Sequence, residues 1–402
     1  MKIVGLIAEY NPFHNGHQYH IEQAKKITGA DAVIVVMSGD FVQRGAPSIM
    51  PKHLRAKSAL LSGASLVLEL PVCYATGSAE FFAYGAVSLL DKLGCVDSIC
   101  FGSECGDIKA LETLAKIISE EPKEYKIFLN KYLKEGNSFP FARQNALKDY
   151  LNTPTLDSII SEPNNILGIE YLKALYRLNS KIKPFTIQRR SSHYHDNQLQ
   201  ETFSSASAIR KELAEAALKN LKEQIPRTSL AFLEDTYQKR YPLYANDFSL
   251  VLKYKLLKET KTTLQTYADV SEELANRIMN RLNDFMNFEQ FCELLKTKEV
   301  TYSRISRALI HILLDIKKED LIEVEYARIL GFQMKDASIL SLIKKNDTIA
   351  LISKLTSKLS LSENAKKMLE QDIFAGNLYE SAICQKFQTP FIHECSKQIE
   401  RI

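Results

Sequence analysis

The stretch MKIVGLIAEYNPFHNGHQYH, residues 1–20, decides the fold. Residues 2–8 form a nearly continuous apolar run, which is typical of a strand buried on both faces of a parallel sheet. Helical spacing of apolar residues follows over 17–28 and stops before Gly29, a residue that often comes directly after a helix. A buried strand, a polar turn and a helix in this order predict the first unit of an α/β domain.

Strands and helices continue to alternate along the next part of the chain. Apolar runs predict strands over 31–37, 65–70, 98–101 and 184–189, with helices over 51–63 and 76–93. From about Leu221 onward the pattern is almost entirely helical. We therefore predict a Rossmann-like α/β domain with a parallel sheet over residues 1–220, and a mostly α-helical domain over residues 221–402.

Composition excludes several classes of protein. An apolar fraction of 45% and a charged fraction of 25% are those of a folded globular protein, not of a disordered chain. The net charge of +4 neither demands nor excludes a nucleic-acid partner. No apolar run approaches the roughly 20 residues of a membrane span, and the N-terminus lacks the pattern of a signal peptide. We expect a cytoplasmic protein with no membrane contact, whose seven cysteines are buried thiols.

The turn His14-Asn15-Gly16-His17 carries the clearest chemical signal. Two histidines three residues apart lie on the same side of a helical turn, so both rings can face one ligand. At a helix N-terminus they join unpaired backbone N–H groups and the positive end of the helix dipole, a combination that suits a polyphosphate. We predict that His14 and His17 stabilise charge during attack on the α-phosphate of ATP. The alternative is a polar helix turn with unremarkable histidines.

Other polar segments follow the predicted strands, where an α/β sheet forms its ligand crevice. Asp40, Gln43, Arg44 and Lys52 come after the second strand and are candidate contacts to a substrate or metal. Ser205 and Ser207 open a later helix as a second anion-binding end, or as plain N-caps. Arg189 and Arg190 follow the last predicted strand and could hold a phosphate, or could simply be exposed.

Several segments together make the sequence recognisable. The H-x-G-H turn with the later S-S-x-S-x-I-R segment resembles the HIGH-type nucleotidyltransferase superfamily. EYNPFHNGHQYHI, MSGDFVQRGAP, GASLVLELP, FGSE, PNNILGIEYLKAL and TYSRISRALIHILL are, more closely, similar to the bacterial tRNA(Met) cytidine acetate ligase family. The resemblance implies an ATP site made of Ile7, Ala8, Glu9, Tyr10, Asn11, Pro12, Phe13, His14, Asn15, Gly16, His17, Gln18, Tyr19, His20, Gly102, Asn165 and Arg190.

The resemblance also implies a reaction. Acetate and ATP would give acetyladenylate, whose acetyl group would pass to the wobble cytidine of elongator tRNA(Met) to form N4-acetylcytidine. No protein nucleophile is required, and Mg²⁺ would come with ATP, held largely by its phosphates and water. No metal site of the protein and no protein partner are expected. Two alternatives stay open: a small-molecule adenylyltransferase of the same superfamily, and a non-catalytic nucleotide- or RNA-binding protein.

The helical half must then hold the tRNA. Within 301–316, the residues Arg304, Arg307 and His311 are spaced three and four apart and share one helix stripe. They are candidate contacts to RNA phosphates. The alternative is a solvated helix face. The sequence does not indicate which aromatic side chain receives the unstacked base.

Overall fold

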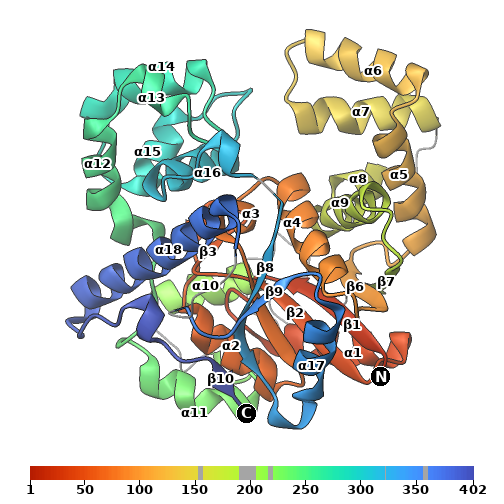
Figure 1. Ribbon diagram of the computed structural model, residues 1–402. Coiled ribbons are helices and arrows are strands. Elements are labelled where there is room, and N and C mark those ends of the chain that lie inside the picture. The colour runs from red at the N-terminus through yellow and green to blue at the C-terminus, as the bar shows by residue number, and fades with distance from the viewer. Residues whose placement is uncertain (153–156, 190–204, 216–220, 322, 356–360) are drawn as a thin grey trace.

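A single sheet lies at the centre of the molecule. The computed structural model describes residues 1–152, 157–189, 205–215, 221–321, 323–355 and 361–402. Strand order is β10-β8-β5-β2-β1-β6-β7, with β9 paired to β8 (Figure 1). The strands of this sheet are β1 (Ile3–Ala8), β2 (Ala32–Ser38), β5 (Leu66–Leu70), β6 (Ser98–Ser103), β7 (Lys183–Gln188), β8 (Tyr326–Phe332), β9 (Ala350–Ile352) and β10 (Glu400–Arg401). A separate hairpin consists of β3 (Phe41–Val42) and β4 (Ala46–Pro47).

The five strands predicted from apolar runs form the parallel part of the sheet, β5-β2-β1-β6-β7. Ile34 and Val36 of β2 point into one apolar cluster, while Val33 and Val35 point into another on the opposite face. All four side chains are fully buried. Both faces of the strand are therefore covered, which is why its sequence is a continuous apolar run rather than an alternating one.

Helices cover both faces of this parallel part. On one side α1 (Asn15–Thr28) and α2 (Lys52–Leu61) pack against the sheet, and on the other α4 (Ala79–Lys92) and α9 (Pro163–Arg177) do so. The remaining helices of the first half are α3 (Val72–Ala75), α5 (Ile108–Glu120), α6 (Lys123–Lys134), α7 (Phe139–Leu151), α8 (Asp157–Ser161) and α10 (Ala206–Glu215). The prediction of a Rossmann-like α/β unit is confirmed.

The second half is mostly helical, as predicted. Its helices are α11 (Arg227–Thr236), α12 (Ser249–Lys258), α13 (Lys261–Leu264), α14 (Glu272–Arg281), α15 (Phe288–Leu295), α16 (Tyr302–Leu313), α17 (Ser338–Asn346) and α18 (Glu363–Phe387). Short 3₁₀ turns include η3 (Ala245–Phe248), η4 (Leu282–Asp284), η5 (Lys318–Asp320), η6 (Met334–Asp336) and η7 (Glu394–Ser396). Helices α12–α16 form what we call the helical lobe. Figure 1 shows this lobe and the α6–α7 hairpin standing apart on the same side of the sheet.

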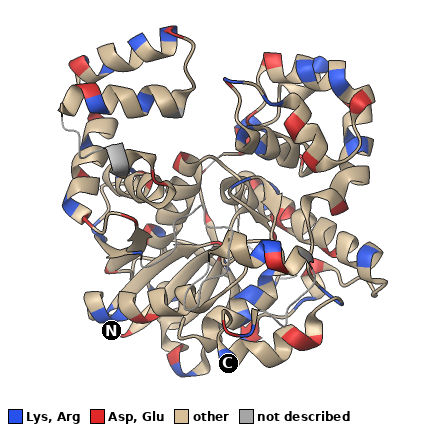
Figure 2. Cartoon of the chain, turned by 180° about the vertical axis from the view of Figure 1, so that it is seen from behind, with Lys and Arg blue, Asp and Glu red and all other residues tan. Residues whose placement is uncertain are grey.

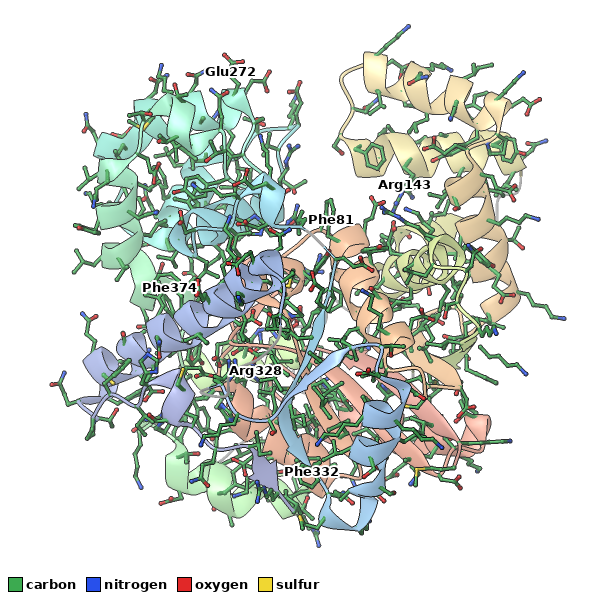
Figure 3. The ribbon with its side chains drawn as sticks, in the orientation of Figure 1. Phe81, Arg143, Glu272, Arg328, Phe332 and Phe374 are labelled. Carbon is green, nitrogen blue, oxygen red and sulfur yellow. The ribbon has the colours of Figure 1, made fainter. Side chains whose placement is uncertain are left out.

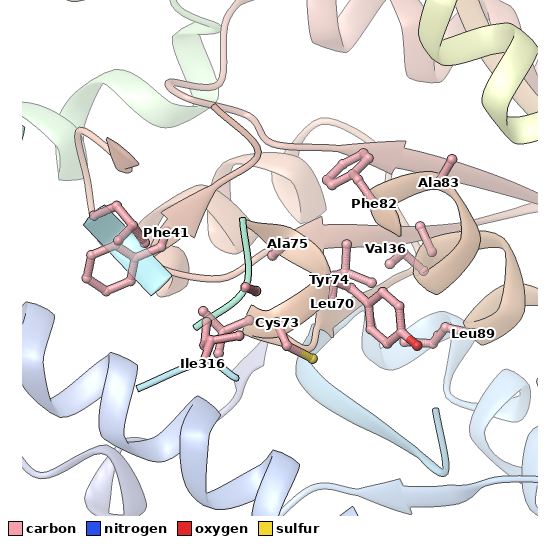
Figure 4. Packing of buried hydrophobic residues seen from close by; sticks show 14 of the residues in the cluster. Val36, Phe41, Leu70, Cys73, Tyr74, Ala75, Phe82, Ala83, Leu89 and Ile316 are labelled. Carbon is pink, nitrogen blue, oxygen red and sulfur yellow. The ribbon is translucent and has the colours of Figure 1, made fainter. Parts of the chain in front are cut away.

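The C-terminal residues also extend the sheet, which the sequence pattern does not predict. Strand β8 runs antiparallel to β5 and places Arg328 opposite Glu69. The strand is only seven residues long and includes Arg328, and periodicity alone does not distinguish so short a segment from a buried helix. The domain boundary near residue 220 stays a prediction, but the main sheet crosses it. The hydrophobic core also contains residues from both halves: in Figure 4, Ile316 of the second half lies near Cys73 and Phe41 of the first.

A buried ionic cluster lies where the two halves meet. Lys52 Nζ is 2.7 Å from carboxylate oxygens of both Glu69 and Glu394. Arg328, labelled in Figure 3, pairs with the same two carboxylates at 2.7 and 2.5 Å. Although burial raises the pKa of Glu394, these cations hold it well below its usual range. The positive and negative charges compensate one another within the cluster. Because its members come from α2, β5, β8 and η7, the cluster joins these four elements.

The distribution of charges, the cysteines and the helix hydropathy can be described briefly. Lysines and arginines are interspersed with acidic residues over both helical parts (Figure 2). All seven cysteines are free thiols, but only Cys73, Cys100 and Cys292 are buried. The other four are partly exposed, which corrects the expectation that every cysteine is buried. Within the described ranges, none of the helices combines the length and the apolar character needed to cross a membrane.

Candidate active site

The turn after β1 fixes both predicted catalytic histidines. Helix α1 begins at Asn15, with His14 as its N-cap. The Nδ1 atom of His14 accepts a hydrogen bond from the Gly16 backbone N–H at 3.1 Å. The Nδ1 atom of His17 accepts one from the His14 backbone N–H at 3.2 Å. The two ring centroids are 3.8 Å apart, so the imidazoles form one compact pair at the helix tip.

These backbone contacts determine the tautomer of both rings. A backbone N–H can only donate, so each Nδ1 is the unprotonated nitrogen and each neutral ring carries its proton on Nε2. Burial, together with the smaller effects of Arg189 and Arg210, lowers the pKa of His14 to about 3. Burial, His14 and Arg189 together hold the pKa of His17 well below its usual range. At neutral pH each ring is therefore an uncharged donor through Nε2–H.

The histidine pair opens onto a cavity of about 790 Å³. Its walls come from the β1–α1 turn, the hairpin after β2, strands β6 and β7, helix α10 and the helical lobe. The predicted site residues that line it are Ile7, Ala8, Glu9, Tyr10, Asn11, His14, Gly16, His17, Tyr19, His20, Gln43, Arg44, Gly102, Ser205, Ser207 and Arg307. Pro12, Phe13, Asn15, Gln18 and Asn165 do not line it. Most of the predicted residues are thus brought together in one place.

Positive charge surrounds the cavity. Arg189, directly after β7, lines it and lowers the pKa of His14, His17 and His20, in addition to the larger effect of burial. Arg210 Nη1 donates to the Asn11 carbonyl at 2.7 Å, which ties α10 to the histidine turn. Ser205 Oγ accepts from the Ala208 N–H at 3.0 Å and caps α10, whose N-terminal end faces the cavity. Two guanidinium groups and two helix N-termini favour an anionic ligand.

Asn165 does not line the cavity but hydrogen-bonds to the loop after β6. Its Oδ1 accepts hydrogen bonds from the backbone N–H groups of Glu104 and Cys105 at 2.9 and 3.2 Å. The Glu104 carboxylate in turn accepts from the Asn165 backbone N–H at 2.9 Å. This reciprocal pairing fixes Gly102, where a Cβ would lie 3.3 Å from the Arg189 side chain. The segment FGSE and the segment PNN therefore act as one unit.

The comparisons with known proteins agree with this geometry. The family model described as HIGH Nucleotidyl Transferase matches residues 1–391. A tRNA(Met) cytidine acetate ligase of Acetivibrio thermocellus is 44% identical over 399 residues, covering 96% of each chain. One of Thermoanaerobacter sp. (strain X514) is 44% identical over 95% of this chain and 96% of its own. The chain belongs to the tRNA(Met) cytidine acetate ligase family.

Solved structures of this ligase family have the same fold over the whole chain. The apo form I of Thermotoga maritima TmcAL superposes with a TM-score of 0.94 at 32% identity, covering 100% of both chains. The form II crystal of that protein, bound with alpha-thio ATP, gives a TM-score of 0.91 at the same identity and coverage. Both the parallel sheet and the helical lobe are thus features of the ligase family.

Asp40 requires a correction against the sequence-based prediction. Its side chain is buried and does not line the cavity. Its Oδ1 accepts from the Lys52 backbone N–H at 2.8 Å, and its Oδ2 lies 3.6 Å from Lys52 Nζ. Lys52 is another predicted contact residue, but its Nζ pairs with Asp40 and with Glu69 and Glu394 of the ionic cluster. Both residues therefore stabilise the loop after β2 and do not face a ligand.

Arg55 is a supporting residue that the sequence pattern does not single out. It is fully buried in α2, and its Nη1 donates to the carbonyls of Glu9 and Ser38 at 2.6 and 3.0 Å. Its Nη2 donates to the Gly39 carbonyl. Because these carbonyls lie at or directly after the ends of β1 and β2, one guanidinium group fixes the two strand ends that lead into the cavity loops. Only the tertiary fold reveals this role, since an arginine within a helix is ordinarily exposed.

The helical lobe contributes directly to the cavity. Besides Arg307, the lobe residues Glu289 and Ser303 line it, and so does Tyr244, which directly precedes η3. Ser303 lies in the segment TYSRISRALIHILL but is not singled out there, and no sequence motif marks Tyr244 or Glu289. Arg304 is exposed on α16 and remains a candidate RNA contact. His311 requires a second correction, because it is buried and its ring nitrogens lie 3.1 Å from the carbonyls of Ala268 and Thr76. His311 therefore packs the lobe against the loop that follows α3, and does not touch RNA. Arg190 and residues 191–204 lie outside the described residues.

Proposed function

We propose that this chain is an ATP-dependent ligase that acetylates the wobble cytidine of elongator tRNA(Met). The observation that carries the proposal is the pair of neutral imidazoles at the tip of α1, inside a cationic cavity, in a chain that is 44% identical over its length to tRNA(Met) cytidine acetate ligases. We also place the protein in the cytoplasm, where a tRNA substrate would be available.

The first step forms a mixed anhydride. A carboxylate oxygen of acetate attacks the α-phosphorus of ATP, the bond from that phosphorus to the bridging oxygen breaks, and pyrophosphate leaves with the electron pair. Negative charge grows on the equatorial and bridging oxygens. The Nε2–H groups of His14 and His17 donate to these oxygens, and Arg189 compensates the charge. Because neither ring needs to change protonation state, the donors are prepared before the reaction starts.

The second step transfers the acetyl group. The exocyclic amine of cytidine attacks the acetyl carbonyl carbon, the bond from carbonyl carbon to phosphate oxygen breaks, and AMP leaves with the electron pair. The proton lost by the amine passes to the departing phosphate. The cavity walls shield the anhydride from bulk water between the steps. No covalent intermediate on the protein is required.

The predicted ATP-binding set supplies the nucleotide contacts in this proposal. The members of residues 7–20 that line the cavity, together with Gly102, would contact ATP, and Asn165 would hold the loop that carries Gly102. The resemblance to the family adds Arg190 to these proposed contacts. Among the described residues, no three His, Cys, Asp or Glu side chains are grouped to hold a metal ion. Mg²⁺ would therefore be bound by the triphosphate and water, and would neutralise charge on the leaving pyrophosphate. Arg304 and Arg307 would contact tRNA phosphates.

Exchange of labelled pyrophosphate into ATP tests the first step. We expect exchange that depends on acetate and needs no RNA. Exchange that instead requires a phosphorylated metabolite would indicate a small-molecule adenylyltransferase. Mass spectrometry of elongator tRNA(Met) after incubation with ATP and labelled acetate tests the second step, with acetate-free and ATP-free reactions as controls. No acetylated cytidine and no AMP release would refute the proposal.

A further inference from the structure

The cavity extends to both sides of the histidine pair. In the sheet, β1 lies between β2 and β6, so the loops after these strands lie on opposite sides of the β1–α1 turn. Gly102 and Arg189 belong to the β6–β7 side, whereas Gln43 and Arg44 sit in the hairpin that follows β2. A volume of about 790 Å³ is near the upper end of the roughly 300–1,000 Å³ of a pocket for one ligand. The β2-side half is therefore a separate part of the cavity, on the other side of the histidine turn from Gly102 and Arg189.

The helical lobe closes this β2-side half. Ser306 Oγ of α16 donates to the Gly45 carbonyl of the hairpin at 2.6 Å. A Cβ on Gly45 would lie 2.2 Å from the Arg307 backbone nitrogen, so the hairpin and α16 touch through their backbones. The cavity wall here therefore combines two segments that are more than 250 residues apart in sequence.

Arg307 is held in a fixed orientation at this wall. Its Nε donates to Asp269 Oδ2 at 2.8 Å and its Nη2 donates to Asp269 Oδ1 at 3.3 Å. A guanidinium group has five N–H donors, and no others of Arg307 bond to a residue within the described ranges. The remaining donors belong to a side chain that lines the cavity and is only 12% exposed. Since Asp269 already fixes the side chain, little rotamer entropy is lost when a ligand binds.

We propose that the β2-side half is an acceptor subsite for the ribonucleotide that receives the acetyl group, with Arg307 bound to a phosphate adjoining that nucleotide. This inference rests on the proposed function. A nucleotide that leaves its stack enters a pocket base first and keeps its flanking phosphates at the mouth. Arg44, on the hairpin, lines the same half and adds a second cation. With the histidine pair between the two halves, the acetyl group passes directly from the adenylate to the amine.

Kinetics of an RNA anticodon stem–loop with a wobble cytidine test the subsite. We compare Arg307→Ala with Arg281→Ala, a control on α14 whose arginine is 55% exposed and pairs with Asp284. For Arg307→Ala we expect kcat/KM for the RNA to fall about 10- to 100-fold, mainly through KM. Acetate-dependent pyrophosphate exchange without RNA is the internal reference, and the loss in acetyl transfer should exceed any loss in exchange at least tenfold. The control should match the wild type in both assays.

The salt dependence of RNA binding is a second measurement. It would not change if Arg307 had a purely structural role. One lost phosphate contact should reduce the slope of log Kd against log salt concentration by about 0.7, the value for single-stranded RNA. Asp269→Asn keeps the Arg307 charge but weakens its fixation, so we expect an unchanged slope and a smaller rise in KM. An Arg307→Ala protein with wild-type slope and KM, or with exchange lost as fully as transfer, would overturn the subsite. Absence of acetate-dependent exchange in the wild type would instead refute the proposed function.

Discussion

At the scale of single residues, hydrogen bonds from backbone N–H groups to Nδ1 place the proton of His14 and of His17 on Nε2. The His17 ring accepts from the His14 N–H, so its Nε2–H is the group left for phosphate oxygens. We expect His17→Ala to lower acetate-dependent pyrophosphate exchange by about 10²- to 10³-fold, the usual cost of one preorganised donor. Glu22→Gln, on the exposed side of α1, should retain wild-type exchange. Equal rates in the two variants would remove His17 from the mechanism.

The low pKa of His14 has a consequence for stability. In the unfolded chain this imidazole titrates near its ordinary value of 6.5, whereas in the fold burial and two nearby arginines lower its pKa to about 3. Between these values the unfolded state binds a proton that the folded state does not. The stability that His14 contributes is therefore fully present above pH 6.5 and is lost as the pH falls toward 3.

Urea unfolding between pH 4 and 6 measures this effect. Each such histidine changes the free energy of unfolding by up to about 1.4 kcal/mol per pH unit. We expect His14→Asn, which preserves an N-cap acceptor, to show a pH dependence shallower than the wild type by about that amount. Parallel curves for the two proteins would mean that His14 is not buried as a neutral ring.

At the scale of elements, the contact between the β3–β4 hairpin and α16 shapes the cavity. Gly45 has φ +73°, and a side chain there would meet the Arg307 backbone, which has no room to yield. We expect Gly45→Ala to destabilise the fold by more than the ~1–2 kcal/mol of a left-handed alanine. Gly136→Ala is the matched control, since Gly136 has φ +80° with nothing within 4 Å of a Cβ. Urea unfolding compares them, and equal losses would show that the hairpin contact is unimportant.

Local features of the fold could be predicted from the sequence, whereas features that depend on tertiary packing could not. The parallel strands and the His14–His17 turn are local signals, because an apolar run or a helix start depends on neighbouring residues. Arg44 and Gln43 were also found, since loops after parallel strands converge on one edge. Asp40 and His311 were wrongly expected to face ligands, because their burial depends on Lys52 and on the Thr76 carbonyl. Tertiary packing alone brings Tyr244, Glu289 and Ser303 to the cavity.

At the scale of the whole molecule, the main sheet and the ionic cluster make the two halves interdependent. Arg328 comes from β8, yet it neutralises Glu69 of β5 and Glu394 of η7. The loop after β2 depends on the same cluster, since Lys52 bonds both Asp40 and these carboxylates. The chain that leaves the helical lobe enters the sheet as β8, so the lobe is linked through the sheet to the strands whose loops line the cavity.

Arg328→Met tests this anchoring. The change leaves two buried carboxylates with one partner fewer, and breaking a buried pair costs about 3–5 kcal/mol. By contrast, loss of the exposed Arg281–Asp284 pair in Arg281→Ala should cost less than about 1 kcal/mol. Equilibrium unfolding in urea measures both, with intrinsic tyrosine fluorescence reporting on the chain. We expect one cooperative transition at a lower midpoint for Arg328→Met, because strands from both halves share the sheet. If only the second half unfolds early while residues 1–220 keep the wild-type midpoint, the two halves are independent and the cluster does not couple them.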